Sequence, residues 1–211
     1  HGFTREQQDA FAVESQRRAT AAIDAGHFKS QIVPIVKQTR KGEVTFDTDE
    51  HVKASTTMET LGKMKPAFKK DGSVTAGNAS GINDGAAFFV LADAARAAKD
   101  GHKAMARLVS YAVAGVPNEI MGEGPIPASK LALKKGGLTL DQMDVIESNE
   151  AFAAQMLACL KDLKLDLGGS ESQVIPIIIG SSGEKLMRFA AEIQRRGLFL
   201  QPVDFPAVPA E

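Results

Sequence analysis

The sequence predicts an α/β fold in which helices cover a central β-sheet. Strand-like and helix-like runs alternate along the second part of the chain, a pattern typical of layered α/β domains. The strand-like runs are FFVLAD (88–93), MARLVSYAVAG (105–115) and MDVIES (143–148). The helix-like runs are DAARAAKDG, SKLALKKGG and EAFAAQMLACLKDLKL. We therefore expect helices packed on a sheet that these three strands help to form.

The first part of the chain predicts a long helix followed by a more irregular region. Thr4 and Gln7 have the spacing of a capping box, and the Ala-rich stretch behind them predicts a helix over 5–25 that ends near Gly26. Three further elements are expected: a short edge strand at 31–37, an exposed turn-rich excursion at 38–53 and a helix from Thr56 to about Lys65.

Composition narrows the function classes. The chain has 211 residues, enough for one domain or for a domain with a smaller appendage. Its 25 Lys+Arg and 26 Asp+Glu residues give a formal net charge of -1. Nucleic acid and anionic membrane are therefore not expected partners. The longest aliphatic run, 174–179, is interrupted by Pro176 and is too short to cross a bilayer. A single cysteine and the lack of an apolar stretch among the first residues favour a reducing compartment, either the cytoplasm or an organelle matrix. The first residue is His rather than Met, which favours a processed or partial chain.

The run GSVTAGNASGINDGAA, 72–87, combines small residues with polar ones. A helix beginning near Ser80 would present backbone N–H groups and a hydroxyl to a neighbouring group, and the glycines would allow that group to come close. The alternative is a tight helix-to-sheet contact, which spacing alone favours. The polar members of the run are Asn78, Ser80, Asn83 and Asp84, and the glycines between them are Gly77, Gly81 and Gly85.

Five motifs in one order favour a ligand site instead. They are DAFAVESQRRATAAI, LGKMKPAF, TAGNASGINDGAA, MGEGPIP (121–127) and SNEAFAAQ (148–155). This series resembles the second half of the thiolase family, the acyl-CoA C-acyltransferases, from about Thr4 to Leu165 and more weakly over 180–197. The resemblance implies a layered thiolase-like α/β fold, with a mixed β-sheet flanked by helices and part of a loop domain. It implies that residues 1–79 end the loop domain and return to the core. Residues 80–211 would then form the C-terminal half-domain, divergent after about 166.

The resemblance also implies a function. Thiolases join or cleave carbon chains at a thioester, typically condensing acetyl-CoA to acetoacetyl-CoA or running the reverse thiolysis. The expected substrate is a coenzyme A (CoA) thioester, with no tightly bound cofactor and no metal. Expected partners are further copies of the chain in a homo-oligomer or a missing N-terminal thiolase half.

Site residues follow from the same motifs. Each has a plainer alternative: a core residue for the apolar ones, a solvated surface charge for the lysine and a helix cap for Ser80 or Asn149. The resemblance implies that Asn149 holds a catalytic water of the oxyanion hole. It also implies that Ser80 meets the pantetheine arm of CoA and that Phe68 and Met121 form apolar walls beside that arm. Lys53 would lie near the adenine, and Ala151 and Phe152 would complete the CoA site.

Three departures from the family pattern concern catalytic groups. The acylated cysteine of the family belongs to a first half that this sequence does not contain. The stretch GGSESQVIPIIIGSSG has Ile175 where the family has a histidine, and an isoleucine cannot transfer a proton. The tail QPVDFPAVPAE replaces a Cys-Gly-rich loop. Cys159 lies at helical spacing with Phe152 and Met156, which favours a buried structural thiol, and His27, His51 and His102 are expected at the surface.

Several explanations of these departures remain open. The chain is one piece of a thiolase whose other piece is separate, a partial or misread thiolase sequence, or a degenerate or engineered relative that keeps the CoA-facing scaffold. Two functions follow: thiolase-type acyl transfer to which this chain contributes CoA-binding and oxyanion-side residues, or a non-catalytic CoA-binding or interaction module.

Overall fold

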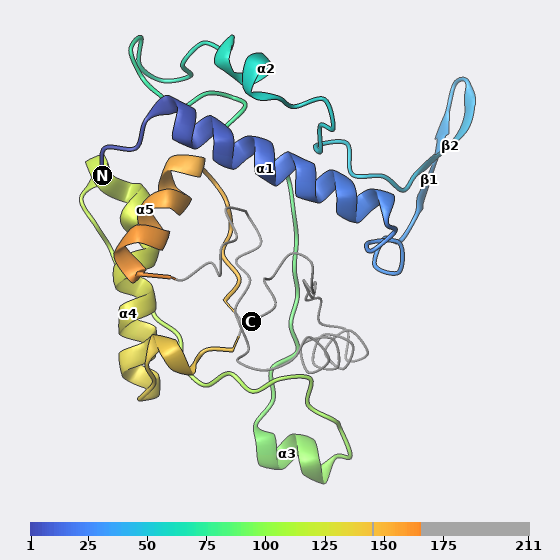
Figure 1. Ribbon diagram of the computed structural model, residues 1–211. Coiled ribbons are helices and arrows are strands. Elements are labelled where there is room, and N and C mark those ends of the chain that lie inside the picture. Colours follow the sequence, from blue (N-terminus) through green and yellow to red (C-terminus); the bar gives the residue numbers. More distant parts are fainter. Residues whose placement is uncertain (145, 166–211) are drawn as a thin grey trace, which may run out of the picture. The chain divides into compact units, whose positions relative to one another are not determined.

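The computed structural model describes residues 1–144 and 146–165, which form two compact units. Unit 1 contains 1–81 and 150–157, and unit 2 contains 82–149 and 158–165. The α-helices and strands, labelled in Figure 1, are α1 (Arg5–Asp24), β1 (Ile35–Thr39), β2 (Gly42–Phe46), α2 (Met58–Gly62), α3 (Ala94–Lys99), α4 (Pro125–Gly136) and α5 (Ala153–Leu163). Two 3-10 helices, η1 (Asn118–Glu123) and η2 (Leu140–Gln142), lie before and after α4 in the chain.

Helix α1 confirms the predicted N-terminal helix and its cap. The Thr4 hydroxyl accepts a hydrogen bond from the Gln7 backbone N–H at 3.2 Å, and the Gln7 side chain accepts one from the Thr4 N–H at 2.8 Å. Both bonds satisfy N–H groups that have no partner within the helix. One face of α1 is buried, with Phe11, Ala12 and Ala22 as its apolar members, and α2 packs beside the helix (Figure 1).

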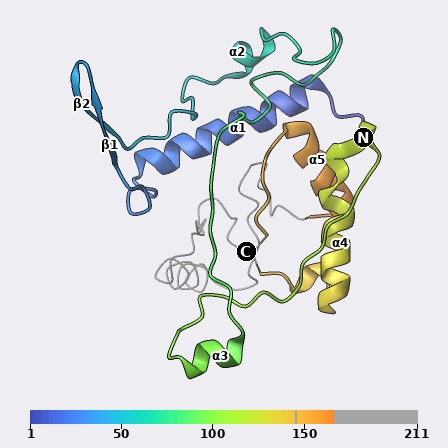
Figure 2. The same ribbon diagram turned by 180° about the vertical axis from the view of Figure 1, so that it is seen from behind.

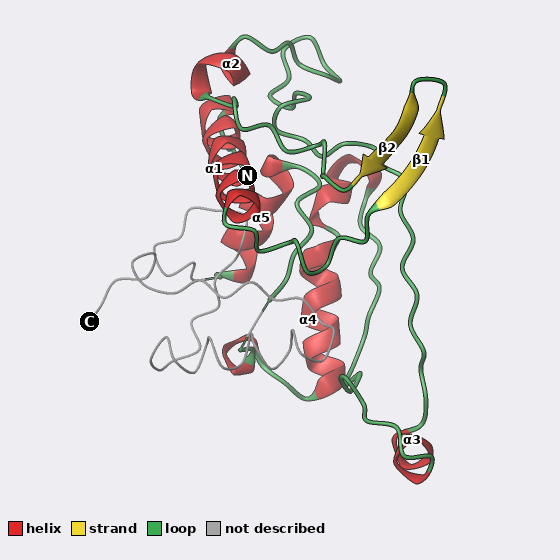
Figure 3. Cartoon of the chain, turned by 90° about the vertical axis from the view of Figure 1, so that its right-hand side faces the viewer, coloured by secondary structure: helices red, strands yellow, loops and turns green. Residues whose placement is uncertain are grey.

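The two strands form an antiparallel hairpin in which every residue is exposed. Strand β1 begins at Ile35 rather than at residue 31, because Pro34 has no N–H to donate to a neighbouring strand. The predicted excursion at 38–53 is exposed, as expected, but its residues 42–46 form β2. Figure 3 shows this hairpin as the sole sheet within the described part of the chain.

Unit 2 contains helices whose caps are readable in the sequence. The Asp93 side chain accepts a hydrogen bond from the Arg96 N–H at 3.0 Å and so caps α3. Helix α4 begins with a proline and ends before Gly137, which has a left-handed backbone with φ of 65°. The predicted helices at 93–101 and 129–137 are confirmed as α3 and α4, with shifted ends. The helix predicted at 150–165 is confirmed as α5, whose residues belong partly to unit 1 and partly to unit 2. The helix expected at 56–65 is present only as the shorter α2 of unit 1.

The three predicted strands of unit 2 are wrong for the described residues. Segments 88–93 and 105–115 have no regular structure, and neither do the described residues of 143–148 (Figure 2). A strand is defined by hydrogen bonds to a neighbouring strand, and an apolar sequence alone does not supply that neighbour. Segment 82–92 is exposed along its whole length. The helices of 1–144 and 146–165 include none that is long and apolar enough to cross a membrane.

Candidate functional site

Two of the sequence motifs are joined through their backbones in unit 1. The N–H of Ser80 donates to the carbonyl of Ala151 at 2.8 Å, and the N–H of Ala153 donates to the carbonyl of Asn78 at 3.0 Å. Between them, Ala79 and Phe152 form an isolated antiparallel bridge. The NASG and NEAF motifs, some 70 residues apart, therefore lie side by side. The helix expected near Ser80 is absent, because this segment is extended and pairs with 151–153.

An open cleft of about 220 Å³ lies beside these paired segments. Glycine, alanine and serine make up much of its lining, together with residues that carry amide and carboxyl groups. The exposed Ser80 belongs to its lining, so its hydroxyl is accessible to a ligand. The lining residues are Phe11, Ala12, Ser15, Gln16, Ala19, His51, Val52, Gly77, Asn78, Ala79, Ser80, Glu150 and Ala153.

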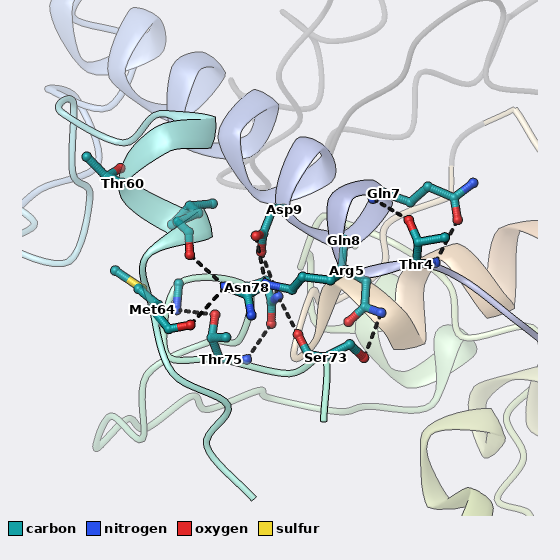
Figure 4. Close-up of polar contacts among 12 residues, drawn as sticks. Thr4, Arg5, Gln7, Gln8, Asp9, Thr60, Met64, Ser73, Thr75 and Asn78 are labelled. Carbon is teal, nitrogen blue, oxygen red and sulfur yellow. Dashed lines mark hydrogen bonds and ion pairs between the residues drawn. The ribbon is translucent and has the colours of Figure 1, made fainter. Parts of the chain in front are cut away.

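A buried polar network joins Asn78 of the cleft lining to helix α1 (Figure 4). The Asn78 side chain donates to the Asp9 carboxylate at 2.8 Å, and the other oxygen of that carboxylate accepts from the Arg5 Nε at 2.7 Å. Asp9 and Asn78 are only 2% and 4% exposed. Sequence reasoning singled out Asn78 but missed Arg5 and Asp9; the available signal was a polar pair at i and i+4 on a helix face that also carries buried apolar residues.

Phe68 and Phe152 meet edge to face, with ring centroids 6.4 Å apart and an angle of 65° between the ring planes. Phe68 is 76% exposed, so this contact leaves most of its ring accessible, as a wall residue of a ligand site requires. Unit 1 therefore brings together four of the predicted site residues: Phe68, Ser80, Ala151 and Phe152.

Lys53 lies one residue beyond the cleft lining. Its backbone N–H donates to the Gln16 side chain at 2.8 Å, and its own side chain is in an exposed part of the chain. Gln16, His51 and Val52 all line the cleft. The backbone of Lys53 is therefore bound to a residue of the cleft lining on the same unit.

Met121 and Asn149 belong to unit 2. Met121 lies in η1 and is 66% exposed, and its carbonyl accepts from the Gly124 N–H at 3.1 Å. Asn149 is exposed and does not cap α5, which begins four residues later. It directly precedes Glu150 of unit 1 in the chain, so the residue predicted to serve the oxyanion is covalently adjacent to the cleft lining.

The single cysteine is a buried thiol. Cys159 is 4% exposed, and its sulfur lies 3.9 Å from the Gly122 carbonyl oxygen. Burial first, and then the negative charges of Asp162 and Glu123, raise the pKa of this thiol. Both effects disfavour the thiolate, and the burial predicted for Cys159 is confirmed.

His27, His51 and His102 do not belong to a metal-binding cluster within the described residues. His27, His51 and His102 are exposed, as the sequence predicted. Within 1–144 and 146–165, no three His, Cys, Asp or Glu residues are placed to hold a metal ion. Ile175 and the 201–211 tail, where the family pattern is broken, lie outside the described residues.

Comparison with known proteins matches both parts of the chain to thiolase domains. The thiolase N-terminal domain matches residues 1–95, and the thiolase C-terminal domain matches residues 102–197. The acetyl-CoA acetyltransferase of Syntrophomonas wolfei is 51% identical over 205 residues, covering 93% of this chain and 51% of the relative. Beta-ketothiolase BktB of Cupriavidus necator is 56% identical over 167 residues, covering 79% of this chain and 42% of the relative.

Solved structures agree with the sequence matches. The crystal structure of the Bacillus anthracis acetyl-CoA acetyltransferase superposes with a TM-score of 0.74 at 46% identity, over 93% of this chain and 51% of that one. Human mitochondrial 3-ketoacyl-CoA thiolase gives a TM-score of 0.70 at 40% identity, with the same coverage. The chain thus spans about half the length of the proteins it matches and has their α/β fold. It belongs to the thiolase family.

Proposed function

We propose that this chain supplies the CoA-binding and oxyanion-side part of a thiolase-type acyl transfer, the condensation of acetyl-CoA or the thiolysis of acetoacetyl-CoA. The observation that supports this most is the pairing of the NASG and NEAF segments beside an open cleft. The relatives whose names include acetyl-CoA acetyltransferase support the substrate class.

The cleft has the chemistry that a pantetheine arm needs. That arm is a long, thin chain with two amide groups, so it requires a narrow path with scattered hydrogen-bonding groups. Gly77, Ala79 and Ala153 leave such a path open, and Ser15, Gln16 and Ser80 offer donors and acceptors along it. A ligand in this path would lie within one residue of Ala151 and Phe152.

Acyl transfer also needs groups for the reacting atoms. In the proposed scheme Asn149 orients a water molecule toward the substrate carbonyl, where hydrogen bonding stabilises the developing negative charge. The nucleophilic thiolate comes from residues that this sequence does not contain, because its one cysteine is buried with a raised pKa. Completing the reaction therefore requires the other thiolase half, in the same polypeptide or as a partner.

Calorimetric titration of the full 211-residue chain with CoA tests the binding part. We expect saturable binding that Ser80→Tyr abolishes, because the phenol ring would fill the cleft beside Ser80. Thr45→Tyr is the matched control, since it adds the same ring to the exposed strand β2. Absence of CoA binding by the unsubstituted chain, or equal binding by both variants, would contradict the proposal.

A non-catalytic CoA-binding module is the second candidate. The isoleucine at position 175, in place of a proton-transferring histidine, favours it. The two functions separate in a thiolysis assay with acetoacetyl-CoA and CoA, in which the N-terminal half of the Syntrophomonas wolfei relative is supplied as a second polypeptide. Thiolysis that depends on Asn149 supports the enzyme. CoA binding without any thiolysis supports the module.

A further inference from the structure

The proposed CoA contact depends on backbone geometry, and that geometry is held by side chains outside the cleft. We propose that Asn78, fixed by the Arg5–Asp9 ion pair of α1, is a positioning residue for Ser80 and for the 151–153 segment. The expected consequence, weaker CoA binding when Asn78 is changed, rests on the proposed function. The positioning of the two backbone segments by Asn78 does not depend on that function.

Every polar group of the Asn78 side chain is already used inside the protein. Its amide nitrogen donates to the Asp9 Oδ1 at 2.8 Å and to the Ser73 carbonyl at 3.0 Å. Its amide oxygen accepts from the Thr75 N–H at 2.8 Å. The side chain is therefore not free to bind a ligand, although Asn78 belongs to the cleft lining, and its role is to hold the backbone.

The Asp9 carboxylate is locked from two directions. One oxygen binds Asn78, and the other binds the Arg5 Nε at 2.7 Å. The Arg5 Nη2 also donates to the Leu61 carbonyl at 2.6 Å and to the Met64 carbonyl at 3.2 Å. Because the buried carboxylate binds both Asn78 and Arg5, and Arg5 also binds two backbone carbonyls, these contacts hold the network in place (Figure 4).

Asn78 transmits this rigidity to the cleft through its own main chain. Its carbonyl accepts the Ala153 N–H at 3.0 Å, and two residues later the Ser80 N–H donates to the Ala151 carbonyl at 2.8 Å. A rotation of Asn78 away from Asp9 would shift both bonds at once. Helix α1 therefore determines where Ser80 and the 151–153 segment lie relative to each other.

Replacement of Asn78 by aspartate tests the inference with almost no change in shape. Asn78→Asp places a carboxylate against Asp9 where a hydrogen bond of 2.8 Å existed, so like charges repel and the Ser73 carbonyl loses its donor. We expect amide hydrogen exchange to accelerate at Ser80 and Ala153, and the CoA dissociation constant to rise on the order of ten- to hundredfold.

Two further variants separate positioning from general loss of stability. The swap Asp9→Asn/Asn78→Asp restores an amide-to-carboxylate hydrogen bond with the partners exchanged, so it should recover part of both the exchange protection and the CoA affinity. Recovery is partial because the Ser73 carbonyl still lacks its donor and Arg5 meets a neutral amide oxygen in place of the Asp9 carboxylate. Glu14→Gln is the matched control, since it removes two ion pairs of the same helix, to Arg17 and Arg18, and neither involves Asn78.

The outcomes distinguish this inference from the proposed function. Unchanged exchange at Ser80 and Ala153 in Asn78→Asp overturns it, as does unchanged CoA affinity in a chain that binds CoA. If exchange accelerates and is partly rescued by the swap, but the unsubstituted chain binds no CoA, the positioning role holds and the proposed function fails. A Glu14→Gln effect as large as that of Asn78→Asp would also overturn it, because the response would then be general.

Discussion

Gly77 is a cleft-lining residue whose missing side chain allows the 61–64 segment to approach. A Cβ at this position would lie 2.4 Å from Leu61 Cδ2 and 2.7 Å from Met64 Sδ. Leu61 is 2% exposed and has little room to move. We expect Gly77→Ala to lower the free energy of unfolding by about 1–3 kcal/mol through overpacking, measured by urea denaturation.

Gly85 provides the control within the same small-residue run. A Cβ there meets no atom within 4 Å, and the backbone has no left-handed φ. Gly85→Ala should therefore leave the unfolding midpoint within error of the original chain. If both substitutions lower the free energy of unfolding equally, the added methyl group at Gly77 causes no specific overpacking, and the prediction is wrong.

Cys159 makes the burial of α5 directly measurable, because it is the only thiol in the chain. Its burial and raised pKa predict slow alkylation by iodoacetamide at pH 8 in the native protein and rapid alkylation in denaturant. Intact mass spectrometry follows the single addition. Rapid native alkylation would contradict the buried position and reopen a nucleophilic role.

Glu14 predicts a pH dependence of stability. The Arg17 guanidinium, through paired hydrogen bonds at 2.6 Å, and then Arg18 lower the pKa of this carboxyl to about 2. A lowered native pKa gives stability that is present above the ordinary value near 4.5 and lost as the pH falls toward 2. Glu14→Gln should lower stability at pH 7 by about 0.5–1 kcal/mol, as for partly exposed ion pairs.

The test is the difference between the two proteins as a function of pH. That difference should be constant from pH 7 to about 5 and should narrow below the ordinary carboxyl pKa. Glu59→Gln, which breaks a more exposed pair with Lys63, should have a smaller effect at pH 7. A difference that widens on acidification would rule out the assigned cause.

At the scale of elements, the helices could be predicted because their signals are local. Thr4 with Gln7, Asp93 before α3 and Gly137 after α4 each act within one turn of the helix end. The strands expected at 88–93 and 105–115 depend on a neighbour elsewhere in the chain, and no local residue specifies that neighbour. The hairpin formed because β1 and β2 are adjacent in sequence.

The cap of α1 is an element that also supports the site. Thr4 holds the first turn, and that turn carries Arg5 and leads to Asp9. Thr4→Ala should lower the free energy of unfolding by about 1 kcal/mol. Because fraying would begin at Arg5, hydrogen exchange should also accelerate at Asn78. Thr48→Ala, in the exposed loop after β2, is the control for an alanine at an exposed threonine. An effect no larger than that control would mean that the capping box contributes no net stability.

At the scale of the whole molecule, the motifs of the candidate site were predictable but their support was not. NASG and NEAF were recognised as residue patterns, and the structure placed them side by side. The Asp9–Asn78 hydrogen bond joins residues 69 apart in sequence. The sequence around either residue does not predict the other as its hydrogen-bond partner, so the support of the cleft by α1 is seen only in the folded chain.

The exposed apolar segment 82–91 leads to a prediction about association. Phe88, Val90 and Leu91 are 92%, 99% and 80% exposed, an arrangement that monomeric proteins usually avoid. We expect the purified chain to bind an apolar dye such as ANS and to scatter light as a species larger than 22.4 kDa. Among the described residues this segment pairs with no strand, so its backbone N–H and carbonyl groups could bind a second chain.

Negative charges placed on segment 82–91 should reduce both the dye binding and the association. Phe88→Asp/Val90→Asp adds two negative charges where a contact is expected, so dye fluorescence should fall and the scattering mass should approach that of one chain. Ala95→Asp/Ala98→Asp adds the same charge on exposed positions of α3 and should leave both readings unchanged. If the original chain is a monodisperse monomer that binds no dye, segment 82–91 is covered in solution. Segment 82–91 would then not be available as the surface that binds a partner half, another copy of the chain or any other protein.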